Sequence, residues 1–201
     1  MTSMMLWFMQ LLHLSSKEVF ILFAFTKSNF WQSLKMRIKY LFIYSVLLAA
    51  FFIFITEAKA QTIPSYKIDQ LDSLIRNSKH PMIINFWATF CIPCIEEIPY
   101  FIQKTKEFED RNVSLLLVSL DMEDYYPVRI TNFATKHNFK APIAWLNETD
   151  ADLFCPRIDK SWSGAIPATL FLNNATGYRK FFEDQISEKQ LEEEIHSMLK
   201  K

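Results

Sequence analysis

The feature that most restricts the fold of this chain is a pair of cysteines, Cys91 and Cys94, between a strand-like and a helix-like segment. Residues 82–88, MIINFWA, are apolar and rich in β-forming types, which predicts a buried strand. Residues 95–109 carry apolar side chains at helical spacing, which predicts an amphipathic helix. We therefore expect the cysteines at the N-terminus of a helix that directly follows a core strand.

Residues 61–201 continue to alternate between strand-like and helix-like segments, which predicts one layered α/β domain. Further helices are expected at residues 68–77, at 128–137 and, after a Ser187–Gln190 capping box, up to about residue 199. Further strands are expected at residues 113–120, 143–146, 168–172 and 178–182. A turn joins the last two strands as a hairpin, and the polar residues 147–152 predict a loop or the start of a helix.

The first sixty residues carry a targeting pattern. Residues 40–55 form an uncharged apolar run that follows three basic residues and precedes the sequence A-K-A at 58–60. A basic flank, an apolar run and a small-residue site are the three parts of a secretory signal peptide, which predicts cleavage before Gln61. An uncleaved membrane anchor is the alternative.

Residues 1–35 contain another, interrupted apolar run upstream of a signal that is already complete. One hypothesis is that Met36 is the natural start, and a two-pass membrane hairpin is the alternative. The expected organisation is therefore an upstream segment at 1–35, a signal peptide or membrane anchor at 36–60, and an exported domain at 61–201.

Charge and cysteine content argue against several classes of protein. Residues 61–201 contain 16 Lys and Arg and 20 Asp and Glu, so we expect no basic nucleic-acid surface. Membrane contact is expected only through the N-terminal segment. A structural zinc site takes four ligands, so no metal is expected from the remaining cysteine and the scattered histidines, which are Cys155, His80, His137 and His196.

The position of the cysteine pair favours thiol-disulfide chemistry. Free N–H groups and the positive end of the helix macrodipole stabilise a thiolate at a helix N-terminus, and the thiolate is the attacking species. Cys91, the first and more exposed cysteine, is expected to attack a substrate disulfide. Cys94, one turn later, is expected to resolve the mixed disulfide, and Pro93 fits an early helical position where its missing N–H costs little.

Three motifs lie in a fixed order: NFWAT at 85–89 within WATFCIPC at 87–94, then Glu97 and Pro99, then GAIPATLFL at 164–172. Together they resemble the thioredoxin superfamily, and in particular its exported TlpA/ResA-like branch. The resemblance runs from about residue 82 to the C-terminus. It implies a thioredoxin-like domain over residues 61–201, with a central mixed β-sheet flanked by helices.

The resemblance implies that the Ile166–Pro167 bond is cis and that the backbone of Ile166 pairs with an extended substrate chain. An ordinary proline at the start of a strand is the alternative. Glu97 is expected either to relay the proton of Cys94, with a pKa raised by partial burial, or to be a solvated helix carboxylate. The expected substrate-binding residues are Trp87, Phe90, Pro93, Ile166 and Pro167. For Trp87, a place in the aromatic core is an equal alternative.

Two residues depart from the family pattern. Phe90 stands where the superfamily usually has Trp, which changes the contact surface but leaves the sulfur chemistry unaffected. Cys155 has no equivalent in the motif. A buried, inert thiol is the expected reading of Cys155, and a regulatory or intermolecular thiol is the alternative.

Together these features predict an exported thiol-disulfide oxidoreductase that exchanges its Cys91–Cys94 dithiol with disulfides of cell-envelope proteins. The redox-active pair is the expected reaction centre, with no cofactor and with an unidentified electron donor. The Ile92-Pro93 pair supplies no charge to stabilise a thiolate strongly, which favours a reductant or isomerase over a strong oxidant. By family analogy, reduction of apocytochrome c before haem attachment is one candidate task.

Two other functions share this fold. A peroxiredoxin-type peroxidase would need a Thr-x-x-Cys loop, whereas Thr89 lies only two residues before Cys91. A redox-inactive binding module with structural cysteines is the non-enzymatic alternative. The presence of both cysteines together with Pro167 argues against it.

Overall fold

The computed structural model describes residues 34–49 and 62–200, and the chain divides into two compact units, Met1–Ala60 and Gln61–Lys201. In the first unit, residues 34–49 form a helix with exposed apolar side chains. Among the described residues, no helix combines the length and the apolar character that a membrane span requires. The expected cleavage site at 58–60 and nearly all of residues 1–35 lie outside the described residues.

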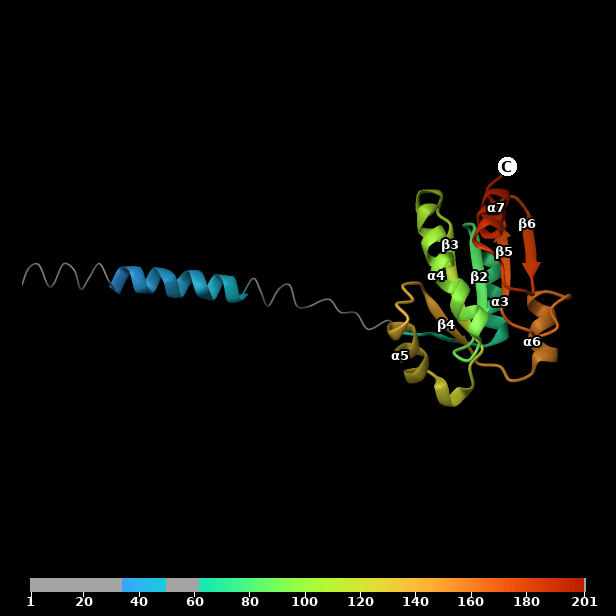
Figure 1. Ribbon diagram of the computed structural model, residues 1–201, viewed down its shortest axis with the longest axis horizontal. Coiled ribbons are helices and arrows are strands. Elements are labelled where there is room, and N and C mark those ends of the chain that lie inside the picture. The colour runs from blue at the N-terminus through green and yellow to red at the C-terminus, as the bar shows by residue number, and fades with distance from the viewer. Residues whose placement is uncertain (1–33, 50–61, 201) are drawn as a thin grey trace, which may run out of the picture. The chain divides into compact units, whose positions relative to one another are not determined.

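The second unit is built on a six-stranded mixed sheet with the strand order β1-β4-β3-β2-β5-β6 (Figure 1). The first four strands in this order run parallel to their neighbours, whereas β5 is antiparallel to β2 and β6 is antiparallel to β5. The strands are β1 (Ser65–Tyr66), β2 (Met82–Trp87), β3 (Ser114–Ser119), β4 (Ile143–Leu146), β5 (Ala168–Asn173) and β6 (Tyr178–Phe182). The predicted α/β fold with a central mixed sheet is confirmed.

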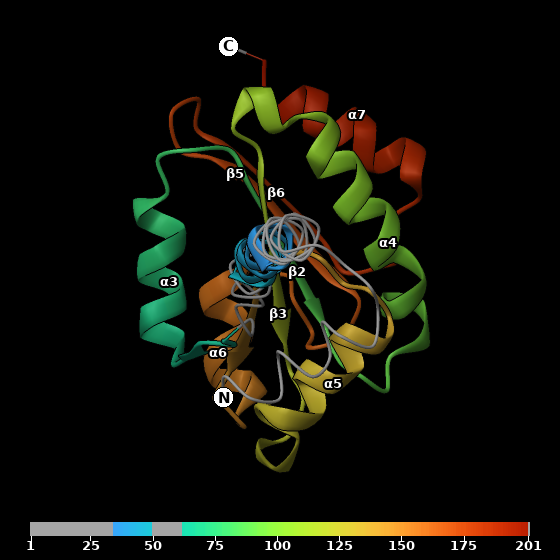
Figure 2. The same ribbon diagram turned by 90° about the vertical axis from the view of Figure 1, so that its left-hand side faces the viewer.

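The described helices of this unit flank the sheet on both faces. They are α3 (Ile68–Asn77), α4 (Ile92–Glu107), α5 (Val128–Lys136), α6 (Ala151–Ile158) and α7 (Glu188–Met198), with 3-10 turns η1 (Glu109–Arg111) and η2 (Glu123–Tyr125). Figure 2 shows α3 and α6 on one side of the sheet and α4, α5 and α7 on the other. The two faces bury two separate apolar clusters.

Strand β2 lies in the middle of the sheet and contributes to both clusters. Ile83 and Trp87 point into the cluster under α4, α5 and α7, whereas Ile84 and Phe86 point into the cluster under α3 and α6. Alternate side chains of a strand face opposite sides, so a strand covered on both faces needs a continuous apolar run. This explains why the sequence between Met82 and Trp87 lacks an alternating polar pattern.

Most predicted boundaries lie within a few residues of the observed ones. At the cysteines the predicted helix starts too late, because α4 begins at Ile92 instead of residue 95. The reason is that Cys91 acts as the N-cap and Pro93 lies in the first turn, where its missing N–H leaves no intrahelical bond unmade. For the region of α6 the sequence predicts only a loop or the start of a helix, at residues 147–152. The reason is that Pro156 and the helix length of eight residues give a weak periodic signal.

Candidate active site

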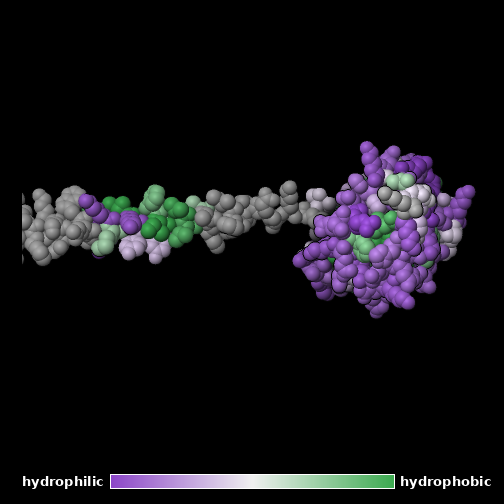
Figure 3. Space-filling view, turned by 90° about the horizontal axis from the view of Figure 1, so that it is seen from above, coloured by the Kyte–Doolittle hydropathy of each residue, from purple (hydrophilic) through white to green (hydrophobic). Residues whose placement is uncertain are grey.

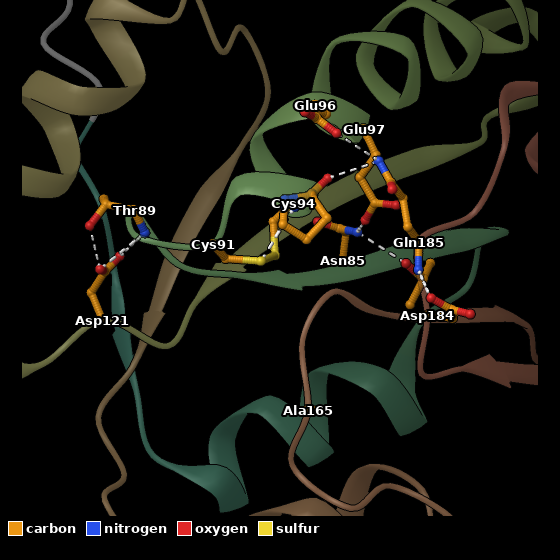
Figure 4. Close-up of a disulfide and its surroundings, with 12 residues drawn as sticks. Asn85, Thr89, Cys91, Cys94, Glu96, Glu97, Asp121, Ala165, Asp184 and Gln185 are labelled. Carbon is orange, nitrogen blue, oxygen red and sulfur yellow. Dashed lines mark hydrogen bonds between the residues drawn. A yellow bond between two sulfur atoms is a disulfide. The ribbon is translucent and has the colours of Figure 1, made fainter.

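The centre of the site is a disulfide between Cys91 and Cys94, where the chain passes from β2 into α4 (Figure 4). Cys94 N donates a hydrogen bond to Cys91 Sγ at 3.3 Å, and Cys91 N donates to Ala88 O at 3.0 Å. Cys91 keeps 7% of its surface exposed, whereas Cys94 has 0%. Cys91 is therefore the less buried of the two cysteines, and a helix N–H already points at its sulfur.

The residues on either side of Cys91 expose apolar, uncharged side chains. Phe90 and Ile92, on either side of Cys91, are 67% and 68% exposed. Pro93 is partly exposed, and its carbonyl accepts a hydrogen bond from Gln185 Nε2 at 3.3 Å. Figure 3 shows an apolar area on an otherwise mainly hydrophilic face of the second unit. Exposed aromatic and aliphatic side chains at a reactive sulfur are suited to contact with a polypeptide.

Trp87 does not reach this surface. Its side chain is fully buried, with ring centroids 5.6 Å from Phe139 and 6.1 Å from Phe133. The prediction that Trp87 contacts substrate is therefore wrong in this state, and the alternative of a core aromatic holds. The cause is the alternation of β2, which points Trp87 into the layer beneath the helices together with Ile83.

Glu97 lies one turn beyond Cys94 in α4 and is fully buried. Its Oε1 accepts a hydrogen bond from Asn85 Nδ2 at 2.7 Å, and its Oε2 accepts one from Ile186 N at 3.1 Å. Burial raises the pKa of Glu97 from 4.5 to about 7, although both hydrogen bonds act to lower it, and the charge of Asp184 adds to the rise. The alternative of a solvated helix carboxylate is thus wrong for Glu97 and fits the exposed Glu96.

Asn85 is a member of this cluster that the sequence reading did not single out. It lies in β2 with no exposed surface, and its Nδ2 also donates to Thr169 Oγ1 at 3.0 Å. Its Oδ1 has no hydrogen-bond partner within the described part of the chain. The available signal was a single polar residue inside the apolar run 82–88, because a buried amide in a central strand needs a partner.

Asp121 is a second polar residue that the sequence reading passed over. Its carboxylate accepts hydrogen bonds from Thr89 N at 3.1 Å, from Thr89 Oγ1 at 2.6 Å and from Ser119 Oγ at 2.8 Å. The loop that leads from β2 to Cys91 is thereby tied to the end of the neighbouring strand β3 (Figure 4). Parallel neighbours end at the same edge of a sheet, which brings these two segments together.

The loop before β5 completes the site. The Ile166–Pro167 peptide bond is cis, and β5 starts at the next residue. The antiparallel register pairs Phe86 with Ala168, so Pro167 lies beside the end of β2 from which the cysteine loop departs. Ile166 is partly exposed, and its backbone N–H and C=O have no hydrogen-bond partner among residues 62–200.

The remaining thiol, Cys155, lies in α6 and is buried and unpaired. Burial raises its pKa to about 11, and the charges of Glu183 and Asp152 add to the rise. Such a thiol stays protonated near neutral pH, which supports the reading of an inert core residue. Within residues 34–49 and 62–200, no group of three or more His, Cys, Asp and Glu is placed to hold a metal ion.

Comparison with known proteins gives a matching family model, matching curated relatives and matching solved structures. A family model described as the AhpC/TSA family matches residues 57–175. Several matching curated relatives carry the name "Thiol-disulfide oxidoreductase ResA". The one from Bacillus thuringiensis (strain Al Hakam) is 29% identical over 63 residues, covering 31% of this chain and 35% of the relative. The one from Bacillus subtilis (strain 168) is 25% identical over 92 residues, covering 46% of each. The chain thus spans less than half the length of these relatives.

Among solved structures, a thioredoxin-related protein from Neisseria meningitidis serogroup B matches with a TM-score of 0.51 and 24% identity. The match covers 62% of this chain and 87% of that chain. The second unit therefore has the fold of a thioredoxin-related protein, as its strand order and mixed sheet indicate.

Proposed function

The chain belongs to the AhpC/TSA family, and we propose that its second unit is an extracytoplasmic thiol-disulfide oxidoreductase that acts mainly as a reductant. The observation that carries the proposal is the disulfide at the start of α4, in which Cys91 keeps 7% of its surface exposed and Cys94 none. An asymmetric pair of this kind separates an attacking thiol from a resolving thiol. The relatives that bear an oxidoreductase name support the same chemistry.

In the reductive direction the reaction has two exchange steps. The Cys91 thiolate attacks one sulfur of a client disulfide, so a Cys91–client bond forms while the client bond breaks and its other sulfur leaves as a thiolate. The Cys94 thiolate then attacks Cys91 Sγ, which releases the second client sulfur and forms the Cys91–Cys94 disulfide. Two electrons pass to the client, whose leaving thiolates take up protons. A dithiol electron donor returns the pair to the reduced state.

The geometry supports the proposal that Cys91 is the nucleophile. The N–H of Cys94 points at Cys91 Sγ and would donate to a thiolate in the reduced state. The helix macrodipole adds a positive field at the same place. Cys91 also retains exposed surface, whereas a client cannot reach Cys94.

Glu97 is the proposed proton acceptor for the resolving thiol. Cys94 is enclosed and must lose its proton before it attacks, so a nearby buried base is useful. Glu97 lies one turn further along α4 with a pKa of about 7, so both of its protonation states are accessible near neutral pH. Asn85 and Ile186 hold the carboxylate in place.

Client binding is proposed to use the apolar rim and the loop before β5. Phe90, Ile92 and Pro93 would contact side chains, and the unpaired backbone of Ile166 would pair with an extended client chain. The signal-like segment at 36–60 supports a place outside the cytoplasm. Clients are then disulfides of cell-envelope proteins, with apocytochrome c as one candidate.

The observations do not favour the peroxidase alternative. The residue three positions before Cys91 is Ala88, and the hydroxyl of Thr89 donates to Asp121 instead of facing the sulfur. The residual exposure of Cys91 argues against a binding module with purely structural cysteines.

The proposal is tested by turbidity-monitored reduction of insulin with dithiothreitol. The wild-type domain should accelerate precipitation of the insulin B chain, Cys91→Ser should abolish the acceleration, and Cys155→Ser should retain it. No acceleration by wild type, or equal acceleration by Cys91→Ser, would remove the reductase function. Cys94→Ser, which lacks the resolving thiol, should then trap natural clients as mixed disulfides.

A further inference from the structure

The loop before Ile166 is held by a carboxylate from another element. Oε1 of Glu183, the residue that follows β6, accepts hydrogen bonds from Ser163 N and Ala165 N, both at 2.9 Å. The hydroxyl of Ser163 donates to the same oxygen. Two backbone N–H groups of one short loop therefore converge on a single side-chain oxygen, which is the geometry of a backbone nest around an anion.

Contacts from the other side hold this loop as well. Trp162 Nε1 donates to Ala165 O at 2.9 Å. Gly164 has a φ of +99°, and a Cβ added there would lie 3.8 Å from Cys155 Sγ. The loop thus passes over α6 in a left-handed conformation that favours glycine. Without a carboxylate at Glu183, the N–H groups of Ser163 and Ala165 would lose their acceptor, and the bond from Trp162 to Ala165 O would remain.

The charge state of Glu183 fits this arrangement. Burial acts to raise its pKa, but the hydrogen bonds donated by Ser163 and Ala165 outweigh that effect and lower the pKa. The side chain is therefore ionised throughout the neutral range, and it is only partly buried. Hydrogen bonds to a charged acceptor are stronger than those between neutral groups.

Ile166 follows Ala165 directly, and its backbone groups are unpaired beside the end of β2. We propose that Glu183 is a positioning residue for client binding, which fixes the loop 163–165 so that the Ile166 backbone is presented to a polypeptide beside Cys91. The proposal rests on the proposed function, because it concerns how that function selects polypeptide disulfides. A small disulfide without a peptide backbone gains nothing from an oriented Ile166.

The test compares two substrates: oxidised insulin in steady state with dithiothreitol as the electron donor, and the small aromatic disulfide dithiobis-nitrobenzoate in a single turnover of the pre-reduced domain. For Glu183→Ala we expect kcat/KM for insulin to fall about fivefold to tenfold, mainly through KM, since the loop loses a charged acceptor. The rate constant with the small disulfide should stay within about twofold of wild type, because the helix N-terminus and Cys91 are untouched. Glu183→Gln retains an Oε1 acceptor and should recover most of the insulin activity.

Two further variants complete the test, one as a control and one as a weaker form of the same change. Glu109→Ala removes an exposed carboxylate from η1 and should change neither substrate. Ser163→Ala removes one donor to Glu183 and should show the same pattern as Glu183→Ala with a smaller effect. An unchanged KM for insulin in Glu183→Ala, or an equal loss on both substrates, would overturn the positioning role. Failure of the proposed function would instead appear in the wild-type protein, as no reaction with either disulfide.

Discussion

Individual polar residues distinguish this site from a simple pair of cysteines on a helix. Glu97, Asn85 and Thr169 form a buried chain of hydrogen bonds beneath the disulfide, and the carboxylate has no exposed surface. A buried carboxylate costs free energy when it is ionised, and this cost is the reason its pKa lies near 7. The same residue is therefore suited to the proposed role of proton acceptor and reduces stability at high pH.

The pH dependence of folding tests this account of Glu97. The pKa of Glu97 is about 7 in the folded protein, against an ordinary value of 4.5. Between pH 4.5 and pH 7 the folded protein therefore keeps a proton on Glu97 that the unfolded chain has lost. The stabilising effect of that proton is present below pH 4.5 and is lost as pH rises through 7. For Glu97→Gln we expect the free energy of unfolding, taken relative to wild type, to rise by about 2–3 kcal/mol between about pH 4 and pH 8.

Asn85 can accommodate this substitution at the cost of its hydrogen bond from Nδ2 to Thr169 Oγ1, a loss that acts equally at both ends of this pH range. Its amide can turn so that the presently unpaired Oδ1 accepts from the new side-chain amide, whose oxygen then accepts from Ile186 N. Urea unfolding across this pH range gives the measurement, and Glu96→Gln, which changes an exposed carboxylate, is the matched control. A parallel pH profile for wild type and Glu97→Gln would contradict the raised pKa.

At the level of secondary-structure elements, the strand-to-helix junction is held by ties between neighbouring segments. Asp121 joins the loop after β2 to the end of β3, and Trp145 of β4 donates to the carbonyl of Asp121 at 2.7 Å. Three adjacent parallel strands thus meet at the edge where the cysteines lie. The position of Cys91 depends on this edge as well as on α4.

Removing the tie should loosen the junction. Asp121→Ala leaves the N–H and hydroxyl of Thr89 and the hydroxyl of Ser119 without their acceptor, so we expect a loss of at least about 2 kcal/mol in the free energy of unfolding. Glu123→Ala, which truncates an exposed side chain in η2, should cost less than about 0.5 kcal/mol. Urea titrations of both variants measure this, and equal stabilities would show that the tie contributes little.

The sequence predicted the elements more completely than it predicted their polar contacts. Local periodicity and turn residues located β4 and α3 with their observed ends, since these signals act over a few neighbouring residues. The partnership of Glu97 with Asn85 and the hold of Glu183 on residues 163–165 join segments that are distant in the chain. Such contacts follow from the strand order, which a periodic pattern does not reveal.

At the scale of the whole molecule, the chain combines a thioredoxin-like unit with an N-terminal segment of a different character. The second unit has a core on each face of the sheet and carries every residue of the candidate site. The first unit holds the basic and apolar residues of the signal-like pattern. This division fits a function in which the first unit delivers the second across a membrane.

Expression of the full chain in a bacterium tests this organisation. We expect the exported protein to begin at Gln61, because the A-K-A sequence at 58–60 offers small residues at the positions a signal peptidase reads. Intact mass of the exported fraction identifies the N-terminus, and Ala58→Leu with Ala60→Leu should block the cleavage. A mature species that keeps residues 36–60 would indicate an anchor instead.

The most direct test of the account follows the sulfur atoms through one turnover. The reduced domain is mixed with oxidised insulin without any other reductant, alkylated and then mapped by peptide mass spectrometry. The account predicts that Cys91 becomes joined to Cys94 in step with the release of insulin thiols, while Cys155 stays a free thiol. If Cys91 and Cys94 stay reduced while insulin keeps its disulfides, exchange through this pair is contradicted.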